Sequence, residues 1–564
     1  MNKSTYKEKN FSILISFMLL LLVVIEALWS GNTIVSDNGW SQFVYLFISV
    51  YLISRLLITH CHYGSAIVML SFAIVCAIEI FLSVSQLLGQ RVSDNCLFTM
   101  TGSFMNPGPL GCFLSVCISL FISYCVKQDK ALHFSADPIK KILFYIVLIV
   151  AFAACIILPA TQSRSAFLAL GLSMFLLVIT TKKIWKRVKP ILKKYWIWIF
   201  TAGAIFTVGV YLYKKPSADG RFLIDKVSIK AMSESGINGV GIGNFGGAYG
   251  EAQAEYFRKR IESKGIDDLD WTVLKENERL TADCPDNAFN EYLYIGVEAG
   301  PIVMLLFIFA LLSAIIMSLK NGTIWCYGII SFAAFALFSY PLHVWELQAV
   351  FSVLMAASVS EKKSCSVLGP VIKYSSFERI TVFVVIVVLA SNLFLEHQQN
   401  KQYDQAKVAI KKITQLHQLE LYDEVVENSD TLFPLFVNNS GFLFAYGQSL
   451  NKTEMYEKSD SVLTIGTKHS SDPMFWNVMG NNSLARGEFR EAEERYKHAF
   501  YMVPNRLYPL YLLAQLYHKE CDTIRFLDMA DRIERFTPKV ENVITERLRS
   551  EIRGLKISYT SEIE

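Results

Sequence analysis

Apolar runs long enough to cross a lipid bilayer recur through the first four hundred residues of this chain. A bilayer core needs about 20 apolar residues in each helix, and eleven runs come close to that length. They cover residues 11–29, 41–58, 65–88, 107–126, 142–160, 165–181, 195–213, 299–319, 324–342, 345–360 and 379–396. The 564 residues are 52% hydrophobic and 18% charged, which is typical of a membrane protein with soluble additions. We expect an all-α, polytopic membrane bundle of about eleven spans over residues 1–396.

Lysine and arginine indicate how such a bundle is oriented, because short cytoplasmic loops are enriched in them. The basic segments are the N-terminus, with Lys3, Lys7 and Lys9, and residues 127–141, 182–194 and 361–379. With eleven spans and the N-terminus inside, all four lie in the cytoplasm. The segments 30–40, 89–106, 161–164, 214–298 and 343–347 then face outward, as does everything after residue 396. The first run lacks a small-residue cleavage site, so we expect it to be retained as a span.

Residues 214–298 form the only long polar interruption of the membrane region, and they are rich in Gly, Asn, Arg and carboxylates. A polar loop of this size at a membrane surface is where chemistry on a membrane-held substrate is expected. Asp267, Asp268 and Asp270 lie within it, but no second cluster of ligands accompanies them. We therefore interpret them as part of a solvated loop and expect no metal site.

Residues 397–564 are different, with polar and amphipathic helical patches. Six residues between 473 and 506 have the spacing of a tetratricopeptide repeat: Trp476, Gly480, Ala492, Tyr496, Ala499 and Pro504. Pro538 follows Pro504 after 34 residues, which is one period. We expect a helical solenoid that either binds a protein partner on its concave face or only caps the membrane domain.

Arg164 and Arg221 are expected at the outward membrane surface, with Arg91 as a weaker third cation on the same side. Charge at the edge of the bilayer is energetically costly, and arginine suits bidentate contact with phosphate. These residues are candidates for binding an anionic headgroup or a diphosphate. The alternative for each is an arginine that merely extends its charged end into water.

Two further runs combine glycine with asparagine. Thr101–Gly111, which contains Asn106, opens a span with Pro and Gly, and this would leave backbone groups to be satisfied inside a cavity. Gly239–Phe245 does not fit a dinucleotide-binding fingerprint, and it predicts a tight turn where the backbone approaches the membrane domain. Glu79 and Gln86 share one face of the preceding helix. They are either functional polar groups or partners in structural hydrogen bonds.

The eleven cysteines include no CxxC pair and no His/Cys cluster, so a zinc site is not expected. Cys96 and Cys284 both fall in outward segments, and we expect them to be close enough for a disulfide in an oxidising compartment. The net charge of +4 is too small to indicate binding to nucleic acid.

Together these motifs resemble the O-antigen ligase/polymerase family of bacterial membrane glycosyltransferases over about residues 70 to 400. The resemblance is carried by five runs in order: "GxFxNPxxxG" at Gly102–Gly111, "SRxA" at Ser163–Ala166, "GR" at Gly220-Arg221, "GxGxGNF" with Gly239, Gly241, Gly243 and Asn244, and a closing run with Asn290, Glu298 and Gly300. Members of the family often carry tetratricopeptide repeats after the last span.

The resemblance implies a GT-C-like bundle in the bacterial inner membrane, with a large periplasmic loop and a periplasmic C-terminal domain. It implies a donor glycan on undecaprenyl diphosphate. A hydroxyl of a glycan, lipid or protein acceptor attacks the anomeric carbon, and the lipid diphosphate leaves. No nucleotide sugar or cofactor is needed and, for the ligases, no metal. Arg164 and Arg221 would neutralise the departing diphosphate, an electrostatic role that can contribute several kcal/mol.

One departure from the family pattern concerns the acceptor. The ligase pattern has a histidine, thought to assist the acceptor, where this chain has Phe289. Phenylalanine cannot accept a proton, so a base must come from elsewhere or be unnecessary. Asp286, Glu291 and His343 are the candidates.

Three kinds of function remain open. The first is glycan transfer, as a ligase, a polymerase or a protein O-oligosaccharyltransferase. The second is a polysaccharide transporter, but transporters have broken helices in two related halves and the sequence has no such internal repeat. The third is an assembly scaffold that acts through its repeats, which leaves Arg164 and Arg221 without a role.

Overall fold

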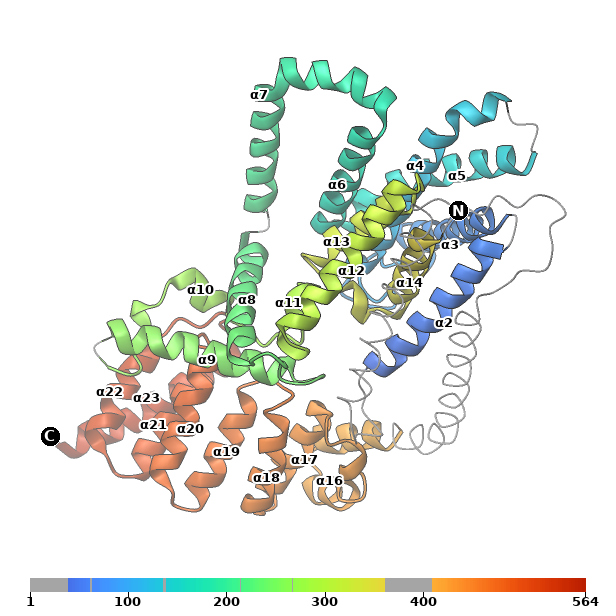
Figure 1. Cartoon of the computed structure of the whole chain (residues 1–564). Coiled ribbons are helices and arrows are strands. Elements are labelled where there is room, and N and C mark those ends of the chain that lie inside the picture. The colour runs from blue at the N-terminus through green and yellow to red at the C-terminus, as the bar shows by residue number, and fades with distance from the viewer. Residues whose placement is uncertain are drawn as a thin grey trace.

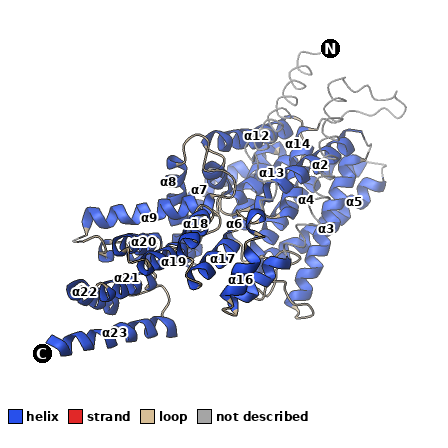
Figure 2. Cartoon of the chain, turned by 90° about the horizontal axis from the view of Figure 1, so that it is seen from below, coloured by secondary structure: helices blue, strands red, loops and turns tan. Residues whose placement is uncertain are grey.

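The computed structural model of this chain describes residues 39–60, 63–134, 138–213, 215–265, 267–360 and 408–563. Every regular element in these ranges is a helix (Figure 2), so the predicted all-α class is confirmed there. The predicted spans at 11–29 and 379–396, the N-terminal lysines and the basic segment at 361–379 lie outside the described residues.

The apolar helices form one bundle. It consists of α2 (Gly39–His60), α3 (Gly64–Leu87), α4 (Pro107–Phe134), α5 (Pro138–Ile157), α6 (Arg164–Thr180), α7 (Lys182–Tyr213), α12 (Pro301–Lys320), α13 (Trp325–Ala336) and α14 (Trp345–Val359). Within the described ranges, four segments are long and apolar enough to cross a membrane: α3, Pro107–Lys127 of α4, α5 extended to Thr161, and α12. Ile149, Phe152 and Leu305 on them are more than half exposed, as expected of side chains that face lipid. The number of eleven spans stays a prediction.

Helix α13 is shorter than the predicted span at 324–342. Its 12 residues rise about 18 Å, well below the roughly 30 Å of a bilayer core. The chain turns because Pro341 disfavours a helical conformation at Tyr340, and a short 3-10 helix, Pro341–His343, follows. Ile329, Phe332 and Phe335 are buried among other helices. The apolar composition of this run therefore serves the core of the bundle.

The predicted basic loop at 182–194 is helical. Residues Lys182–Trp198 continue from α6 after a bend of 105°, and the pair counts as a fifth candidate span if taken together. Helix α7 is interrupted at Tyr195, where φ is −113° and ψ is 16°. Figure 1 shows the first part of α7 running across one end of the bundle and the second part returning beside α6. A basic helix that lies across the end of a bundle suits the membrane–water interface.

The polar segment expected as a loop forms a layer of helices at the opposite end of the bundle (Figure 1). It contains α8 (Lys215–Glu234), α9 (Phe245–Lys264), the 3-10 helix Trp271–Val273, α10 (Glu276–Thr281) and α11 (Glu291–Glu298). We call residues 215–300 the outer region. On α8, the buried residues Leu223, Val227 and Ala231 recur every four positions, so one face of this helix packs into a core.

The C-terminal domain is a series of packed helices. They are α16 (Tyr422–Ser429), α17 (Ser440–Lys452), α18 (Tyr456–Gly466), α19 (Met474–Ala485), α20 (Phe489–Met502), α21 (Tyr508–Lys519), α22 (Thr523–Arg535) and α23 (Val543–Ile563). A Cβ at Gly447 would lie 2.5 Å from Leu463, and one at Gly480 would lie 2.3 Å from Tyr496. The two glycines are 33 positions apart, so equivalent helix pairs pack in the same way. Their assignment as tetratricopeptide repeats stays a prediction.

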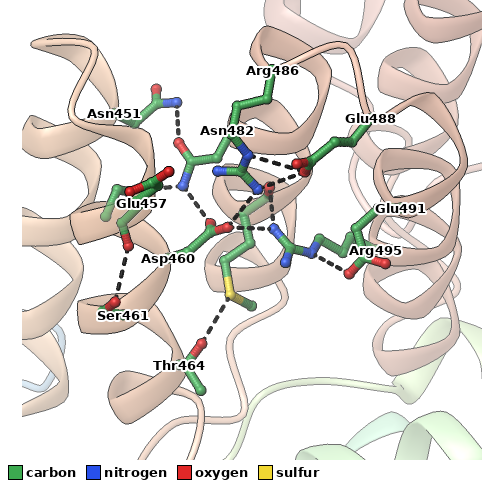
Figure 3. Close-up of polar contacts among 12 residues, drawn as sticks. Asn451, Glu457, Asp460, Ser461, Thr464, Asn482, Arg486, Glu488, Glu491 and Arg495 are labelled. Atoms are coloured by element: carbon green, nitrogen blue, oxygen red, sulfur yellow. Dashed lines mark hydrogen bonds and ion pairs between the residues drawn. The ribbon is translucent and has the colours of Figure 1, made fainter.

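A polar network ties three successive helices of this domain together (Figure 3). The carboxylate of Asp460 on α18 accepts hydrogen bonds from Asn482 at 2.6 Å, from Arg486 at 2.9 Å and from Arg495 at 2.9 Å. These donors come from α19, from its C-terminal cap and from α20. One acceptor shared by three donors fixes the register of neighbouring helix pairs.

The outer region and the C-terminal domain share one hydrophobic core. Leu223 of α8 and Phe257 of α9 belong to the same buried cluster as Phe500 of α20, Leu513 of α21 and Phe526 of α22. The C-terminal domain is therefore not an independent module tethered behind the membrane domain. Part of its surface is covered by the chain's own outer helices, and the docking interpretation remains a prediction for the rest of that surface.

Polar contacts follow the same interface. Gln253 donates to the carbonyls of Asp283 and Met502, and Asn505 donates to the carbonyls of Arg279 and Ala282. The aspartates expected in a solvated loop have partners that the sequence did not indicate. Asp267 pairs with Arg532, and Asp268 accepts from Lys497 at 2.6 Å. Their side chains remain 37% and 52% exposed, so these are surface ion pairs between two distant parts of the chain.

Replacing Gly247 by alanine tests this interface. A Cβ at Gly247 would lie 2.3 Å from the carbonyl oxygen of Lys468, so the C-terminal domain must shift away. Gly554→Ala is the matched control, because that helical glycine has nothing within 4 Å. Alanine favours helix by roughly 1 kcal/mol, so the control should be neutral or stabilising. We expect only Gly247→Ala to lower the thermal midpoint in detergent and to speed proteolysis between the two parts. Equal behaviour of both variants would contradict the shared core.

Candidate functional site

One face of α8 organises the polar groups nearest to the bundle. Ser217, Arg221 and Asp225 are spaced four residues apart, and side chains at this spacing share a helix face. This face is opposite to the one that packs into the shared core, because Leu223 and Val227 lie two positions away from Arg221 and Asp225. The guanidinium of Arg221 donates to the carbonyl of Phe338 at 2.8 Å. Helix α8 thus presents a charged face to the turn between α13 and α14.

Arg164 approaches the same face from the start of α6. Its guanidinium donates to the Ser217 hydroxyl at 3.4 Å. Ser217 precedes Arg221 by one turn of α8, which is a rise of about 6 Å along the helix axis. Burial lowers the pKa of Arg221, and the nearby charge of Arg164 lowers it further. Two cations that repel each other at the outer end of a membrane bundle form an environment that favours an anion.

A carboxylate that the sequence did not indicate completes this face. Asp225 accepts a hydrogen bond from the Asn290 amide at 3.5 Å, and it lines a cavity of about 440 Å³. The amide oxygen of Asn290 is already committed, since it accepts from the backbone N–H of Leu293 at the start of α11. Burial raises the pKa of Asp225 to about 6, against the opposing effects of Asn290 and Arg221. The only sequence signal for Asp225 is its position one turn after Arg221.

Phe289 lies directly beside Arg221. The guanidinium carbon is 5.3 Å from the ring centroid, a cation–π contact, and Tyr340 packs edge-on against the same ring at 5.6 Å. The backbone of Phe289 is left-handed, with φ of 48°, which is uncommon for a bulky residue. The side chain found where the resemblance predicts histidine therefore positions the arginine.

Glu291, which is buried, pairs with the partly exposed His343 beside this surface. One Glu291 oxygen accepts from the backbone N–H of Leu342 at 3.0 Å, and the other lies 3.4 Å from Nδ1 of His343. Burial disfavours protonated His343, but the charges of Glu291 and Glu298 outweigh this effect and raise its pKa. Glu291 is fully buried, so this pair fixes the turn at 341–343. Asp286 is instead exposed in the segment that packs against the C-terminal domain.

Glu298 connects the two glycine-containing motifs of the outer region. One of its oxygens accepts from the backbone N–H groups of Gly243 and Phe245 at 3.0 and 3.3 Å, at the start of α9. The backbone also pairs directly, since Gly241 donates to the carbonyl of Glu298 at 2.9 Å. Gly239 has φ of 72°, and a Cβ there would lie 2.3 Å from the Glu298 carbonyl. This turn approaches the start of α12 in the way that the sequence indicated.

The remaining residues of these motifs are structural neighbours of the turn. The amide of Asn244 donates to the carbonyl of Val240 at 2.9 Å. Gly300 has φ of 90°, and a Cβ there would lie 2.0 Å from the carbonyl oxygen of Ile237. Together with Glu298, these contacts lock the turn before α9 against the end of α11.

The Asn106 run belongs to the opposite wall. A Cβ at Gly111 would lie 2.8 Å from Ser163, so the start of α4 packs tightly beside Arg164. Ser103 donates from its hydroxyl and backbone to Glu79, and Gln86 accepts from the backbone of Gly102 at 2.8 Å. Of the two interpretations of Glu79 and Gln86, these contacts favour structural hydrogen bonds that hold the segment before α4.

Three other expectations concern groups away from this face. Arg91 is exposed, and no contact found among the described residues joins it to Arg164 or Arg221. The disulfide is wrong, because Cys96 and Cys284 are both free thiols and Arg506 donates to the sulfur of Cys284 at 3.3 Å. In the described part of the chain, no group of three or more His, Cys, Asp or Glu residues could hold a metal ion.

Comparison with known families identifies the segment that carries this face. Residues 148–308 match the family described as O-antigen ligase. This part of the chain is therefore similar to the O-antigen ligases. No curated protein matches the sequence. Together with its apolar helices, the match makes this protein a multi-pass membrane enzyme of a glycan-transferring class.

The matched O-antigen ligase segment contains Arg164, Arg221, Asp225, Asn290 and Glu298. It excludes the Asn106 run, His343 and the C-terminal domain. The charged face of α8 and the clamp between α9 and α11 are therefore features of the ligase segment, whereas the domain that buries the other face of α8 lies beyond it.

Glu298 offers a pH-dependent test of this clamp. Burial raises its pKa from 4.5 to about 7, although hydrogen bonds and His343 act against it. The folded state then holds a proton that the unfolded state releases, so stability falls as pH rises from about 4.5 to 7. Glu298→Gln keeps an acceptor for Gly243 and Phe245 without the charge. Its free energy of unfolding relative to wild type, measured by thermal unfolding at each pH, should rise between pH 5 and 7 by up to about 1.4 kcal/mol per pH unit and level off above pH 7.

Two variants accompany this measurement. Glu298→Ala removes the acceptor and should be less stable at every pH. Glu234→Gln, at an exposed carboxylate on α8, should show no such trend. A constant difference between Glu298→Gln and wild type across this range would mean that Glu298 is ionised throughout.

Proposed function

We propose that this protein transfers a glycan from undecaprenyl diphosphate to an acceptor hydroxyl at the outer face of the membrane. The observation that carries the proposal is that Arg164 of α6 and Arg221 of α8 meet at one face of α8. A diphosphate is a compact, multiply charged anion, and two neighbouring guanidinium groups can each donate to it. The acceptor hydroxyl belongs to a glycan, a lipid or a protein.

The cavity next to the arginines supports a lipid-linked donor. Its polar end is formed by Asp225 and Asn290, and the rest is apolar. The apolar lining comes from four helices and consists of Ile229, Tyr292, Leu293, Ile308, Leu311, Leu312, Ile315, Ala333 and Leu337. A cavity that is apolar along α12 and α13 and charged at its mouth suits an amphiphile with an isoprenoid chain and an anionic head.

The chemistry is a displacement at the anomeric carbon. The acceptor oxygen forms a bond to this carbon while the bond to the phosphate oxygen breaks, and the electron pair leaves with the lipid diphosphate. Arg164 and Arg221 stabilise the charge that grows on that leaving group. The contact of Arg221 with Phe289 and with the carbonyl of Phe338 holds its guanidinium in place before the donor arrives.

The same geometry supports an orientation in the bacterial inner membrane. Lys127 donates to the carbonyls of Gly322 and Thr323, so the basic end of α4 lies at the end of the bundle away from the outer region. The C-terminal domain shares its core with the outer region, and both must be on one side of the membrane. We place that side in the periplasm, because the basic segments would then be cytoplasmic.

Replacing either arginine should slow transfer. Arg164→Ala and Arg221→Ala each remove charge-assisted hydrogen bonds of roughly 1.5–3 kcal/mol, which corresponds to about a ten- to hundredfold loss of rate. Lysine should restore activity only in part, since it keeps the charge and loses the planar fork. The measurement adds purified full-length protein to membranes of a strain lacking the gene, which contain both donor and acceptor, and follows polymer formation.

The control is Arg258→Ala, which removes an exposed arginine of α9 that pairs only with neighbours on its own helix. It should transfer at the wild-type rate. If both site variants also retain nearly normal turnover at equal amounts of folded protein, the diphosphate is bound elsewhere.

The orientation has its own test. A reporter enzyme that is active only in the periplasm, fused after Glu564, should be active. The same reporter placed in the basic segment near Lys186 should be inactive. A well-expressed but inactive fusion at the C-terminus would place the C-terminal domain and the outer region together in the cytoplasm.

A further inference from the structure

We propose that Asp225 is the general base that removes the proton from the acceptor hydroxyl. This inference rests on the proposed glycan transfer and adds a residue that neither the motifs nor the family resemblance indicated. It resolves the question raised by Phe289, which cannot accept a proton at the position where the resemblance predicts histidine.

The location of Asp225 fits the role. It follows Arg221 by one turn on the same face of α8 and stands at the polar mouth of the cavity. In a displacement the acceptor hydroxyl lies on the side of the anomeric carbon away from the diphosphate, so its base must stand some distance from Arg221, and one helical turn separates the two residues by about 6 Å along the axis. A base needs to be within about 3.2 Å of the proton that it takes. Asp225 shares the helix face with Arg221 and also lines the cavity, which Arg221 itself does not line.

The other carboxylates near the site do not line the cavity. Glu291 is fully buried and accepts from the backbone of Leu342 while facing His343. Glu298 is buried beneath the turn before α9. Asp286 is exposed, in the segment that contacts Ser471 of the C-terminal domain through the carbonyl of Pro285. None of the three bases proposed from the sequence, Asp286, Glu291 and His343, therefore lines the cavity that Asp225 lines.

Asn290 orients the carboxylate. Because its amide oxygen accepts from the backbone of Leu293, its NH2 group must face Asp225. That single hydrogen bond of 3.5 Å engages one oxygen of Asp225 and leaves the other available to the cavity. The amide is neutral and does not hold the carboxylate as strongly as a salt bridge would, so Asp225 can take up a proton.

The charged groups around Asp225 set its protonation. Asn290 at the start of α11 and Arg221 on α8 favour the carboxylate, and Arg164 of α6 lies beyond Arg221. The residues of α12 and α13 that line the cavity are all apolar and disfavour charge. Burial raises the pKa of Asp225 to about 6. At neutral pH the group is mostly ionised, yet basic enough to accept a proton efficiently.

The step balances without any further reactant. The proton of the acceptor hydroxyl moves to the free oxygen of Asp225, and the acceptor oxygen bonds to the anomeric carbon. The bond from that carbon to the phosphate oxygen breaks, and its electron pair leaves with the lipid diphosphate, which Arg164 and Arg221 neutralise. Asp225 then releases its proton to water.

The test compares Asp225→Asn, Asp225→Glu and wild type across pH 5 to 8, with full-length protein added to membranes of the deletion strain. Asparagine keeps the shape and the contact with Asn290, so thermal unfolding should match wild type. Transfer should fall about 10²- to 10⁴-fold. The wild-type rate should decline below about pH 6 as the carboxylate is protonated, and Asp225→Asn should lose this decline. Asp225→Glu should keep it with reduced turnover.

Glu234→Gln, which removes an exposed carboxylate of the same helix, is the matched control and should behave as wild type. If wild type makes no polymer from these membranes, the proposed function fails. If wild type is active and Asp225→Asn keeps its rate, only the role of Asp225 is overturned. A slower Asp225→Asn with an unchanged pH profile also overturns it, since a structural role would produce that result.

Discussion

The hydrophobic core shared by the outer region and the C-terminal domain is the interaction on which the rest of the site depends. Leu223, Val227 and Ala231 bury one face of α8 in this core, and the opposite face then has to carry Arg221 and Asp225. Without the buried face, an isolated helix of 20 residues with a largely polar sequence would have little reason to stay folded at a membrane surface. The distant C-terminal helices therefore support the charged face although they contribute no side chain to it.

Buried polar contacts set the fine position of the same elements. Glu298 fixes the turn before α9 to the end of α11, and Glu291 fixes the turn before α14 to the start of α11. Each buried carboxylate accepts from backbone N–H groups with one oxygen only, while its other oxygen has no hydrogen bond within the described part of the chain, so burial of these groups keeps an energetic cost. Helix α11 is thereby held at both ends, and it presents Asn290 to Asp225 and Phe289 to Arg221. This short helix and the residue before it thus position Asp225 and Arg221, the two charged residues on that face of α8.

The site combines two arginines that repel each other with a largely apolar cavity. Arg164 of α6 and Arg221 of α8 both reach one face of α8, and Asp225 on that face lines the cavity. Such an arrangement is stable because the fold around it is rigid, and it has highest affinity for a ligand that brings negative charge and apolar surface together. The stacking of Arg221 on Phe289 gives the guanidinium a fixed orientation that a histidine there would provide less well when protonated.

The sequence by itself determined the helical class and the membrane character, and it singled out Arg164 and Arg221 as candidates. These follow from local properties: the length of apolar runs, the distribution of lysine and arginine, and short motifs in a fixed order. Only the tertiary structure decided how α13 is used, because a run of apolar residues looks the same whether it faces lipid or other helices. Only the structure joined Asp267 to Arg532 and kept Cys284 away from Cys96, since such pairs are set by packing between segments far apart in the chain. The sequence did not single out Asp225 for the same reason, because its partner Asn290 is 65 residues away. A carboxylate is recognised as a candidate only once the fold has placed it beside a cation and a cavity.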